Sequence, residues 1–164
     1  MSEDARCYLV IRIKGSVKAR REHLDTLQML NLKRANWATI VPKTPSYEGM
    51  LKKVEHMITW GEPNLKTVKT FLRRVELAGD GRLDDEAVKK LGFNSLEDLA
   101  KKIYSAEITL NKLKEKGVKP YARLHPPRGG FKKTIKKHVS AGGEYGYRGE
   151  KINELFVRMA GIEA

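Results

Sequence analysis

The sequence predicts an α+β fold in which a small sheet packs against helices. Over residues 1–61 the apolar pattern alternates between the strand and helix periods, in the order strand, helix, strand, helix, strand. Helical patterns fill residues 62–117. Residues 118–164 contain a late strand, a basic Gly/Pro-rich loop and a C-terminal helix. We therefore expect a core, a helical insertion and a basic C-terminal part.

The first strand is expected at residues 7–14, which are β-branched and at first apolar on both faces until Gly15 ends the run. This pattern is typical of a central strand. The following helix presents four apolar residues at helical spacing opposite a charged face: Val17, Leu24, Leu27 and Leu30. The second strand is expected at residues 37–41, which are β-branched and aromatic and are bounded by Pro42.

The second helix has a clear start signal. Thr44 supplies an N-cap hydroxyl, and Pro45 occupies the first helical position, where its missing N–H costs nothing. The apolar stripe of this helix consists of Tyr47, Met50, Leu51, Val54 and Met57. A short third strand is expected at residues 58–60. We expect the two helices to lie on one face of the small sheet.

The insertion is expected to be a series of short helices. The first is capped by Asn64 and should end near residues 79–81, a Gly-Asp-Gly turn. Its inward side chains are Leu65, Val68, Phe71, Leu72 and Val75. A second helix is expected at residues 84–91, closed by Gly92, and Ser95 begins a capping box for a third.

Charge is the strongest signal in the composition. The chain has 33 Lys and Arg residues against 20 Asp and Glu residues, a net charge of +13, which points to a polyanionic partner, nucleic acid first. The excess is five up to residue 60, two over residues 61–117 and six over residues 118–150. Residues 116–143 hold eight basic residues and no acid, whereas a merely solvated surface would mix both signs. We therefore expect two RNA-facing stretches and a protein- or solvent-facing insertion.

No catalytic or metal-binding constellation stands out, so we expect no cofactor, no metal and no small-molecule substrate. The four histidines lack metal-ligand spacing: His23, His56, His125 and His138. Cys7 allows neither a disulfide framework nor a cysteine zinc cluster, and within a strand it is best interpreted as a core residue. Because neither a membrane span nor a signal peptide is recognisable, we expect a soluble, cytoplasmic protein with no membrane partner.

After a late strand at residues 119–124, glycine and proline interrupt every element and predict a basic, flexible loop up to a helix at residues 151–159. In residues 126–133 the prolines restrict the direction of the chain, and the glycines let backbone N–H groups approach phosphates. The lysines and arginine would release counterions from a bound RNA. Three aromatic residues are candidates for stacking on bases or, equally, for pinning the loop to the domain: Phe131, Tyr145 and Tyr147.

Particular residues add a family resemblance to this picture. In the core the ordered pattern is Thr26-Leu27, Leu30, Leu32, Arg34, Asn36, Thr44-Pro45, Gly49-Met50 and Lys53-Val54. Further on it includes RLHPPRGGF at residues 123–131 and AGGEYG at residues 141–146, with Arg148 and Ile152-Asn153. The chain resembles the large-ribosomal-subunit protein L-thirty family, called L-seven in eukaryotes. Its long form, and the few residues before the first strand, favour an archaeal-type member.

The resemblance implies a ferredoxin-like core and a non-enzymatic, structural role in the large ribosomal subunit in the cytoplasm. It also implies binding to 23S-type rRNA, with the 5S rRNA region nearby, and contacts with neighbouring large-subunit proteins. The RNA-binding residues expected from the basic loop and from the flanks of the first helix and second strand are Arg20, Arg21, Lys33, Arg34, Lys43, Thr44, Arg123, His125, Arg128, Gly129, Gly130, Phe131, Lys132, Lys133, Lys136, Lys137, His138, Tyr145 and Arg148.

Two other classes of function remain open from the sequence. A free RNA chaperone or RNA-binding regulator acting off the ribosome would use the same basic surface. A small enzyme acting on an acidic substrate would instead require a cleft in which titratable groups with perturbed pKa values converge. The structure can show whether such a cleft exists. It does not separate the ribosomal from the free RNA-binding function, because both require the same basic surface.

Overall fold

A computed structural model describes residues 6–77, 85–127 and 130–160. Within these ranges seven strands form one sheet in the order β4-β5-β2-β1-β3-β7-β6. The strands are β1 (Cys7–Arg12), β2 (Trp37–Pro42), β3 (Ile58–Gly61), β4 (Val75–Leu77), β5 (Val118–Arg123), β6 (Thr134–His138) and β7 (Gly143–Tyr147). The helices are α1 (Arg21–Met29), α2 (Pro45–Lys53), α3 (Leu65–Arg74), α4 (Asp85–Lys90), α5 (Leu96–Tyr104), α6 (Leu110–Glu115) and α7 (Ile152–Ala160), with 3-10 turns η1 (Glu55–Met57), η2 (Val139–Ala141) and η3 (Gly149–Lys151). The predicted α+β class is confirmed.

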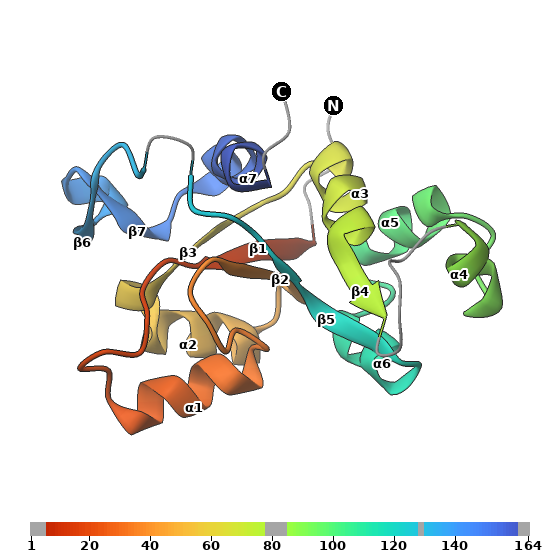
Figure 1. The fold of residues 1–164 in the computed structure, drawn as a ribbon, viewed down its shortest axis with the longest axis horizontal. Helices are drawn as coiled ribbons and strands as arrows, with labels where there is room; N and C mark the ends of the chain where they lie inside the picture. Colours follow the sequence, from red (N-terminus) through yellow and green to blue (C-terminus); the bar gives the residue numbers. More distant parts are fainter. Residues whose placement is uncertain (1–5, 78–84, 128–129, 161–164) are drawn as a thin grey trace.

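The first five elements form the expected ferredoxin-like core. Strand β1 lies between β2 and β3 and is antiparallel to both (Figure 1). Strand β5 adds to the outer side of β2 in the antiparallel sense, and β7 adds to the outer side of β3 in the parallel sense. The last third of the chain therefore extends the sheet on both sides of the core.

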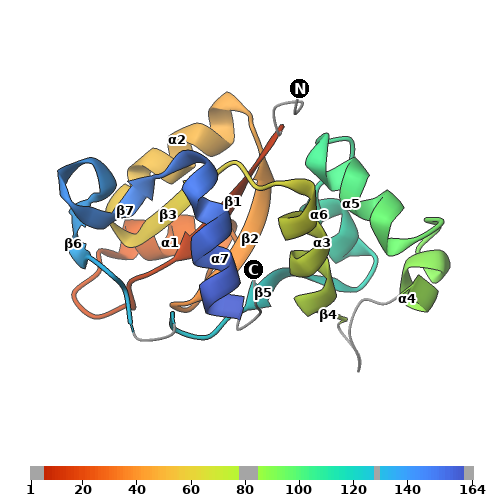
Figure 2. The ribbon, with the colours of Figure 1, turned by 90° about the horizontal axis from the view of Figure 1, so that it is seen from above.

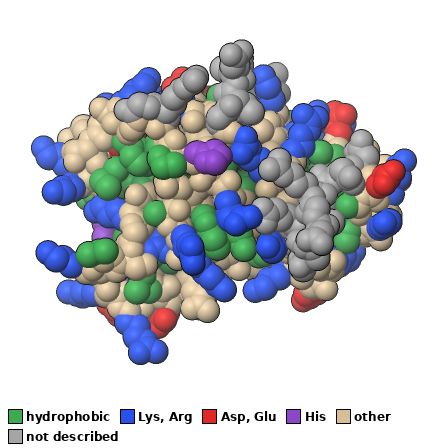
Figure 3. Space-filling view, viewed as in Figure 1, with side chains coloured by type: hydrophobic (Ala, Val, Ile, Leu, Met, Phe, Trp, Pro, Cys, Tyr) green, Lys and Arg blue, Asp and Glu red, His purple; other side chains and the backbone are tan. Residues whose placement is uncertain are grey.

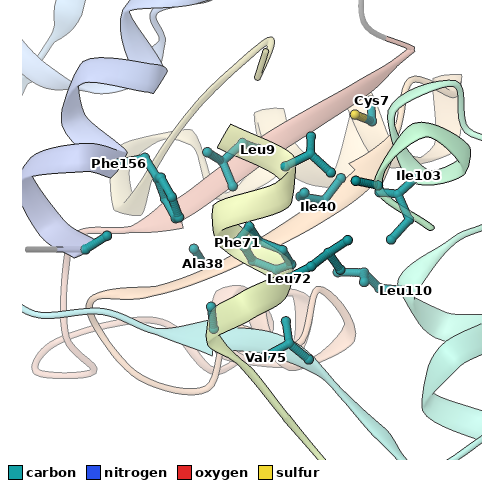
Figure 4. Packing of buried hydrophobic residues seen from close by; sticks show 14 of the residues in the cluster. Cys7, Leu9, Ala38, Ile40, Phe71, Leu72, Val75, Ile103, Leu110 and Phe156 are labelled. Carbon is teal, nitrogen blue, oxygen red and sulfur yellow. The ribbon is translucent and has the colours of Figure 1, made fainter. Parts of the chain in front are cut away.

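Helices cover both faces of the sheet, as Figures 1 and 2 show. Helices α1 and α2 share one face, where they bury Val10 and Trp60. Helices α3, α5 and α7 cover the other face, where Leu9, Phe71 and Phe156 belong to the larger cluster (Figure 4). Both faces of β1 are therefore buried, which explains why its sequence is apolar in succession rather than alternating.

The predicted helix starts are confirmed by side-chain caps. The Thr44 hydroxyl accepts a hydrogen bond from the backbone N–H of Tyr47, with Pro45 at the start of α2. The Asn64 side chain accepts from the N–H of Thr67 at α3, and the Ser95 hydroxyl accepts from the N–H of Asp98 at α5. Each such cap typically stabilises a helix by about 1 kcal/mol.

Some boundaries differ from the prediction. Helix α1 begins at Arg21, so Val17 lies outside the helical stripe and its surface is 87% exposed. Helix α3 ends at Arg74 because Val75 pairs with Ala122 of β5 and starts β4; the turn expected at residues 79–81 lies outside the described residues. Helix α6 was not predicted.

The stretch after β5 is more ordered than the predicted loop, because it contains β6 and β7. Close backbone approach explains the glycines here: a Cβ atom at Gly143 would collide with the backbone of Lys137. Gly146 has φ of +97° and lies against the His138 ring, where a Cβ atom would also collide. These glycines are therefore used for internal packing. No helix in the described ranges is long and apolar enough to span a bilayer.

Candidate nucleic-acid interface

The edge strand β6 carries the densest group of exposed cations. Four lysines on and just before it are exposed: Lys132, Lys133, Lys136 and Lys137. None of them makes an ion pair with a described acidic residue. Figure 3 shows Lys and Arg side chains along the margin of the molecule where β6 lies in Figure 1. Lysines also discourage an edge strand from pairing with other chains, so this pattern has a structural use as well.

A buried ion pair anchors this basic edge to the sheet. The Arg148 guanidinium lies 2.8 Å from a carboxylate oxygen of Glu144, and their side chains are only 11% and 6% exposed. Arg148 also donates to the Thr59 hydroxyl of β3 at 2.7 Å, while Glu144 accepts from the backbone N–H of Lys133 at 3.0 Å. Arg148 is thus engaged within the protein, and it holds β6, β7 and β3 together.

The other predicted loop residues that are half-buried also have internal contacts. His138 Nε2 lies 2.7 Å from a carboxylate oxygen of Glu55, and its ring meets the Tyr145 ring edge-on at 5.5 Å. Phe131 and Tyr145 pack against the larger hydrophobic cluster. The interpretation of these aromatics as pins for the loop is therefore supported by contacts. Lys14, which the sequence analysis did not select, places its ammonium group 5.5 Å from the centre of the Tyr145 ring.

The predicted residues of the core divide into exposed and engaged ones. Those with exposed side chains are Arg20, Arg21, Lys33 and Arg34; of these, Arg20 also forms a surface ion pair with Glu22 at 3.7 Å. Lys43 is instead paired with Glu62 at 3.1 Å and lies over the Tyr8 ring, 5.0 Å from its centre. Thr44 is used as the cap of α2. The exposed arginines and lysines flank α1, so the surroundings of the first helix carry more exposed positive charge than those of the second strand.

The remaining residues predicted to bind RNA lie in the linker between β5 and β6. Arg123 and His125 are exposed, and the backbone N–H of His125 donates to the Met159 carbonyl at 2.9 Å. Gly130 is exposed with φ of +82°, and its carbonyl accepts from Arg158 at 2.8 Å. The two remaining predicted residues, Arg128 and Gly129, lie outside the described residues. The linker is thus tied to α7 at two points.

One functional residue that the sequence analysis missed is Arg12, which is 1% exposed. Its guanidinium donates to the carbonyl of Leu32 at 2.9 Å, to the carbonyl of Lys14 at 2.8 Å and to the hydroxyl of Ser16 at 3.1 Å. These bonds tie the loop before α1 to the loop after it, and both loops carry exposed cations. An arginine inside an otherwise apolar strand was the available signal.

Among the described residues, no group of three or more His, Cys, Asp or Glu side chains is placed to hold a metal ion. Burial raises the pKa of the Cys7 thiol to about 12, so this cysteine is unreactive at neutral pH and serves as a core residue. The His23 and His56 rings pack together at 4.8 Å. Burial first, then the charges of His23 and Lys14, lower the pKa of His56, which favours the neutral ring.

The fold and this surface define a basic α+β protein with a group of exposed lysines at one edge of its sheet. The family model for "Ribosomal protein L30p/L7e" matches residues 8–58. The protein named large ribosomal subunit protein uL30 from Ignicoccus hospitalis is 48% identical over 155 residues, 93% of this chain and 96% of the relative. Its namesakes from Nanoarchaeum equitans and Methanosphaera stadtmanae are each 46% identical, over 92% and 93% of this chain and 97% and 99% of their own lengths.

The chain therefore belongs to the uL30 family of large-subunit ribosomal proteins, in its archaeal form. The predicted family is confirmed, and with it the expectation that the chain is a structural component and not an enzyme. The residues matched by the family model fall within the core from β1 to β3. The full-length relatives also cover the insertion and the basic C-terminal part.

Proposed function

We propose that this chain is a structural constituent of the large ribosomal subunit, in the cytoplasm, that binds 23S-type rRNA close to the 5S rRNA region and stabilises the rRNA fold during translation. The observation that carries the proposal is the one-signed edge at β6. Its four exposed lysines are Lys132, Lys133, Lys136 and Lys137. Protection of the edge strand accounts for some of this lysine, and a polyanion that neutralises the charges accounts for their concentration at one edge.

We assign two roles to the residues predicted to bind RNA. The exposed residues contact phosphates: the arginines and lysines Arg20, Arg21, Lys33, Arg34, Arg123 and the four lysines of the β6 edge, together with the His125 ring. The engaged residues position those cations: Lys43, Thr44, Phe131, His138, Tyr145 and Arg148. This division follows from hydrogen-bond geometry, since a guanidinium that already spends its donors on Glu144 and Thr59 has few left for a phosphate.

Binding itself is the function. Each cation that meets a phosphate releases counterions from the RNA, and this supplies affinity without reading sequence. The shape of the folded rRNA then selects the site, because the deep groove of an A-form helix hides the base edges from side chains. Neighbouring large-subunit proteins are further partners in this proposal, and the near-neutral insertion from α3 to α6 offers them a surface with little cationic excess.

Sedimentation of a cell extract in high-salt sucrose gradients tests the proposal. We expect the protein to migrate with the large subunit, and hydroxyl-radical footprinting of those subunits with and without the protein should show protected 23S-type rRNA near the 5S rRNA. Recovery of the protein chiefly in the soluble fractions would overturn the proposal and favour a free RNA chaperone or regulator. Protection of rRNA far from the 5S region would overturn only the placement.

A further inference from the structure

An open groove lies between α1, the α1–β2 loop, the end of α6 and the start of β5, with a volume of about 640 Å³. Typical small-molecule sites have volumes of about 300–1,000 Å³, so the groove has room for a nucleotide but not for a duplex. At its rim the Asn31 side chain donates to Asn111 at 3.2 Å, and Asn111 donates to the Tyr47 hydroxyl at 2.8 Å. These bonds join the two walls.

A stacked aromatic pair lies at the β5 side of the groove. Tyr121 of β5 lines the groove, and its ring stacks on that of Trp37 with centroids 4.1 Å apart and an interplanar angle of 7°. Beside it, the Thr39 hydroxyl donates to the Pro120 carbonyl at 2.9 Å. Because both rings are fixed before any ligand arrives, a flat ligand packed against Tyr121 would lose little side-chain entropy on binding.

The lining combines cations with an exposed apolar side chain. Three lysines line the groove against one carboxylate: Lys33, Lys114 and Lys119 against Asp25. Lys33 and Lys114 are exposed and make no ion pair within the described part of the chain. Met29, also in the lining, is 61% exposed and is one of three large hydrophobic side chains that the described residues leave exposed.

We propose that this groove receives an unpaired nucleotide of the bound RNA. The base packs against Met29 and Tyr121, and the flanking phosphates meet the lysines. This inference rests on the proposed rRNA binding and adds a site in which only Lys33 belongs to the set expected from the sequence. Single-stranded RNA is commonly held by such a pairing of a flat stacking surface with nearby positive charge.

A protein segment is a poorer occupant of the groove for two reasons. Strand β5 pairs with β4 on one side and with β2 at Ala122 and Arg123 on the other, and the Thr39 hydroxyl occupies the Pro120 carbonyl, so an extended peptide finds little free edge there. A helix would require a continuous apolar stripe, yet Met29 is the one large apolar side chain of the lining that is mostly exposed. The excess of lysine over carboxylate also favours a polyanion.

Binding of the full chain to large-subunit rRNA, measured against salt concentration, tests the groove. Replacing Lys33 and Lys114 by Gln should reduce the log–log salt slope by about 1.4 for unpaired RNA, which corresponds to roughly tenfold weaker binding at physiological salt. Met29→Ala should weaken binding without changing the slope, because it removes an apolar contact and no charge. The matched control replaces Lys66 of α3 and Lys101 of α5, which are exposed and lie on helices that cover the opposite face of the sheet from α1, and should leave both quantities unchanged.

A chemical probe attached near the groove tests whether unpaired RNA lies there. Because Cys7 is buried, Lys112→Cys on α6 provides a single reactive thiol near the groove for an iron–EDTA group, and Lys66→Cys on α3 provides the control. We expect cleavage at unpaired nucleotides from Lys112→Cys alone. If wild-type protein binds rRNA but the double lysine variant keeps its affinity and slope, the groove proposal fails while the proposed function stands. If wild-type protein does not bind rRNA, both fail. A cross-link from Lys112→Cys to a ribosomal protein instead of RNA also overturns the groove proposal.

Discussion

The four lysines at the β6 edge allow a quantitative test of how this protein holds RNA. Replacing Lys132, Lys133, Lys136 and Lys137 together by Gln removes four exposed charges from one edge of the sheet. Each phosphate contact contributes about 0.9 to the log–log salt slope on duplex RNA, by the coefficient for B-DNA, and about 0.7 on single strands. We therefore expect the slope to fall by about 3.6 on helical rRNA, or by about 2.8 where the RNA is unpaired.

The structure indicates that this variant stays folded. The nearby hydrogen bonds of β6 use the backbone N–H groups of Lys133 and Lys136, which glutamine retains. Surface substitutions of this kind usually change stability by no more than about 0.5 kcal/mol. An unchanged melting temperature of the variant provides the check.

The assay is equilibrium filter binding to large-subunit rRNA between about 50 and 200 mM salt. Over this fourfold range the wild-type affinity should fall roughly 100-fold more than that of the variant, from the slope difference of about 3.6. The matched control replaces four exposed lysines of the insertion by Gln: Lys66, Lys89, Lys90 and Lys101. Equal salt slopes for the two quadruple variants would refute the reasoning, because the slope would then depend on the number of positive charges and not on their position.

Three further outcomes follow from the internal contacts. Arg12→Leu should lower the free energy of unfolding in urea by about 2–4 kcal/mol, because it strands the Leu32 carbonyl in the interior; a loss below about 0.5 kcal/mol would contradict this account. Gly143→Ala should disrupt the pairing of β6 with β7, because the added Cβ atom meets the backbone of Lys137, and the disruption should be seen as faster amide exchange. Gly49 lies on α2 with no atom near its missing Cβ, so Gly49→Ala should instead stabilise the protein by about 0.5–1 kcal/mol. Burial raises the pKa of the Glu62 carboxyl, but hydrogen bonds from Tyr147 and Lys43 outweigh burial and hold this pKa below the usual 4.5. The ionised carboxylate therefore stabilises the fold above about pH 4.5, and this contribution is lost on acidification. Glu62→Gln should accordingly make the free energy of unfolding fall less steeply as the pH is lowered below about 4.5.

Local signals in the sequence predicted the core well. Thr44 with Pro45, Asn64 and Ser95 each mark a helix start within four residues of sequence, and all three caps are present. The apolar run at residues 7–14 predicted a central strand correctly, because burial on both faces leaves a direct trace in the sequence. Family resemblance added the ferredoxin-like arrangement, which periodicity alone did not determine.

The features that escaped prediction depend on contacts between distant parts of the chain. Strand β7 has a glycine-rich sequence, and it is a strand because Thr59 and Trp60 of β3 lie beside it. The engagement of Arg148 with Glu144 and Thr59 likewise depends on β7 lying against β3, which composition does not reveal. The groove between α1 and β5 joins segments about ninety residues apart, so no local motif marks it.

The late closure of the sheet has a consequence for synthesis. The Thr39 hydroxyl of β2 meets its partner 81 residues further along the chain, and the Thr59 hydroxyl of β3 meets its partner 87 residues further along. While the chain emerges from N- to C-terminus, both edges of the three-stranded core therefore stay open until β5 and β7 have been made. Such long-range pairings slow folding and leave edges that neighbouring nascent chains can join. The last 47 residues thus protect the first sixty from self-association as well as carrying much of the positive charge.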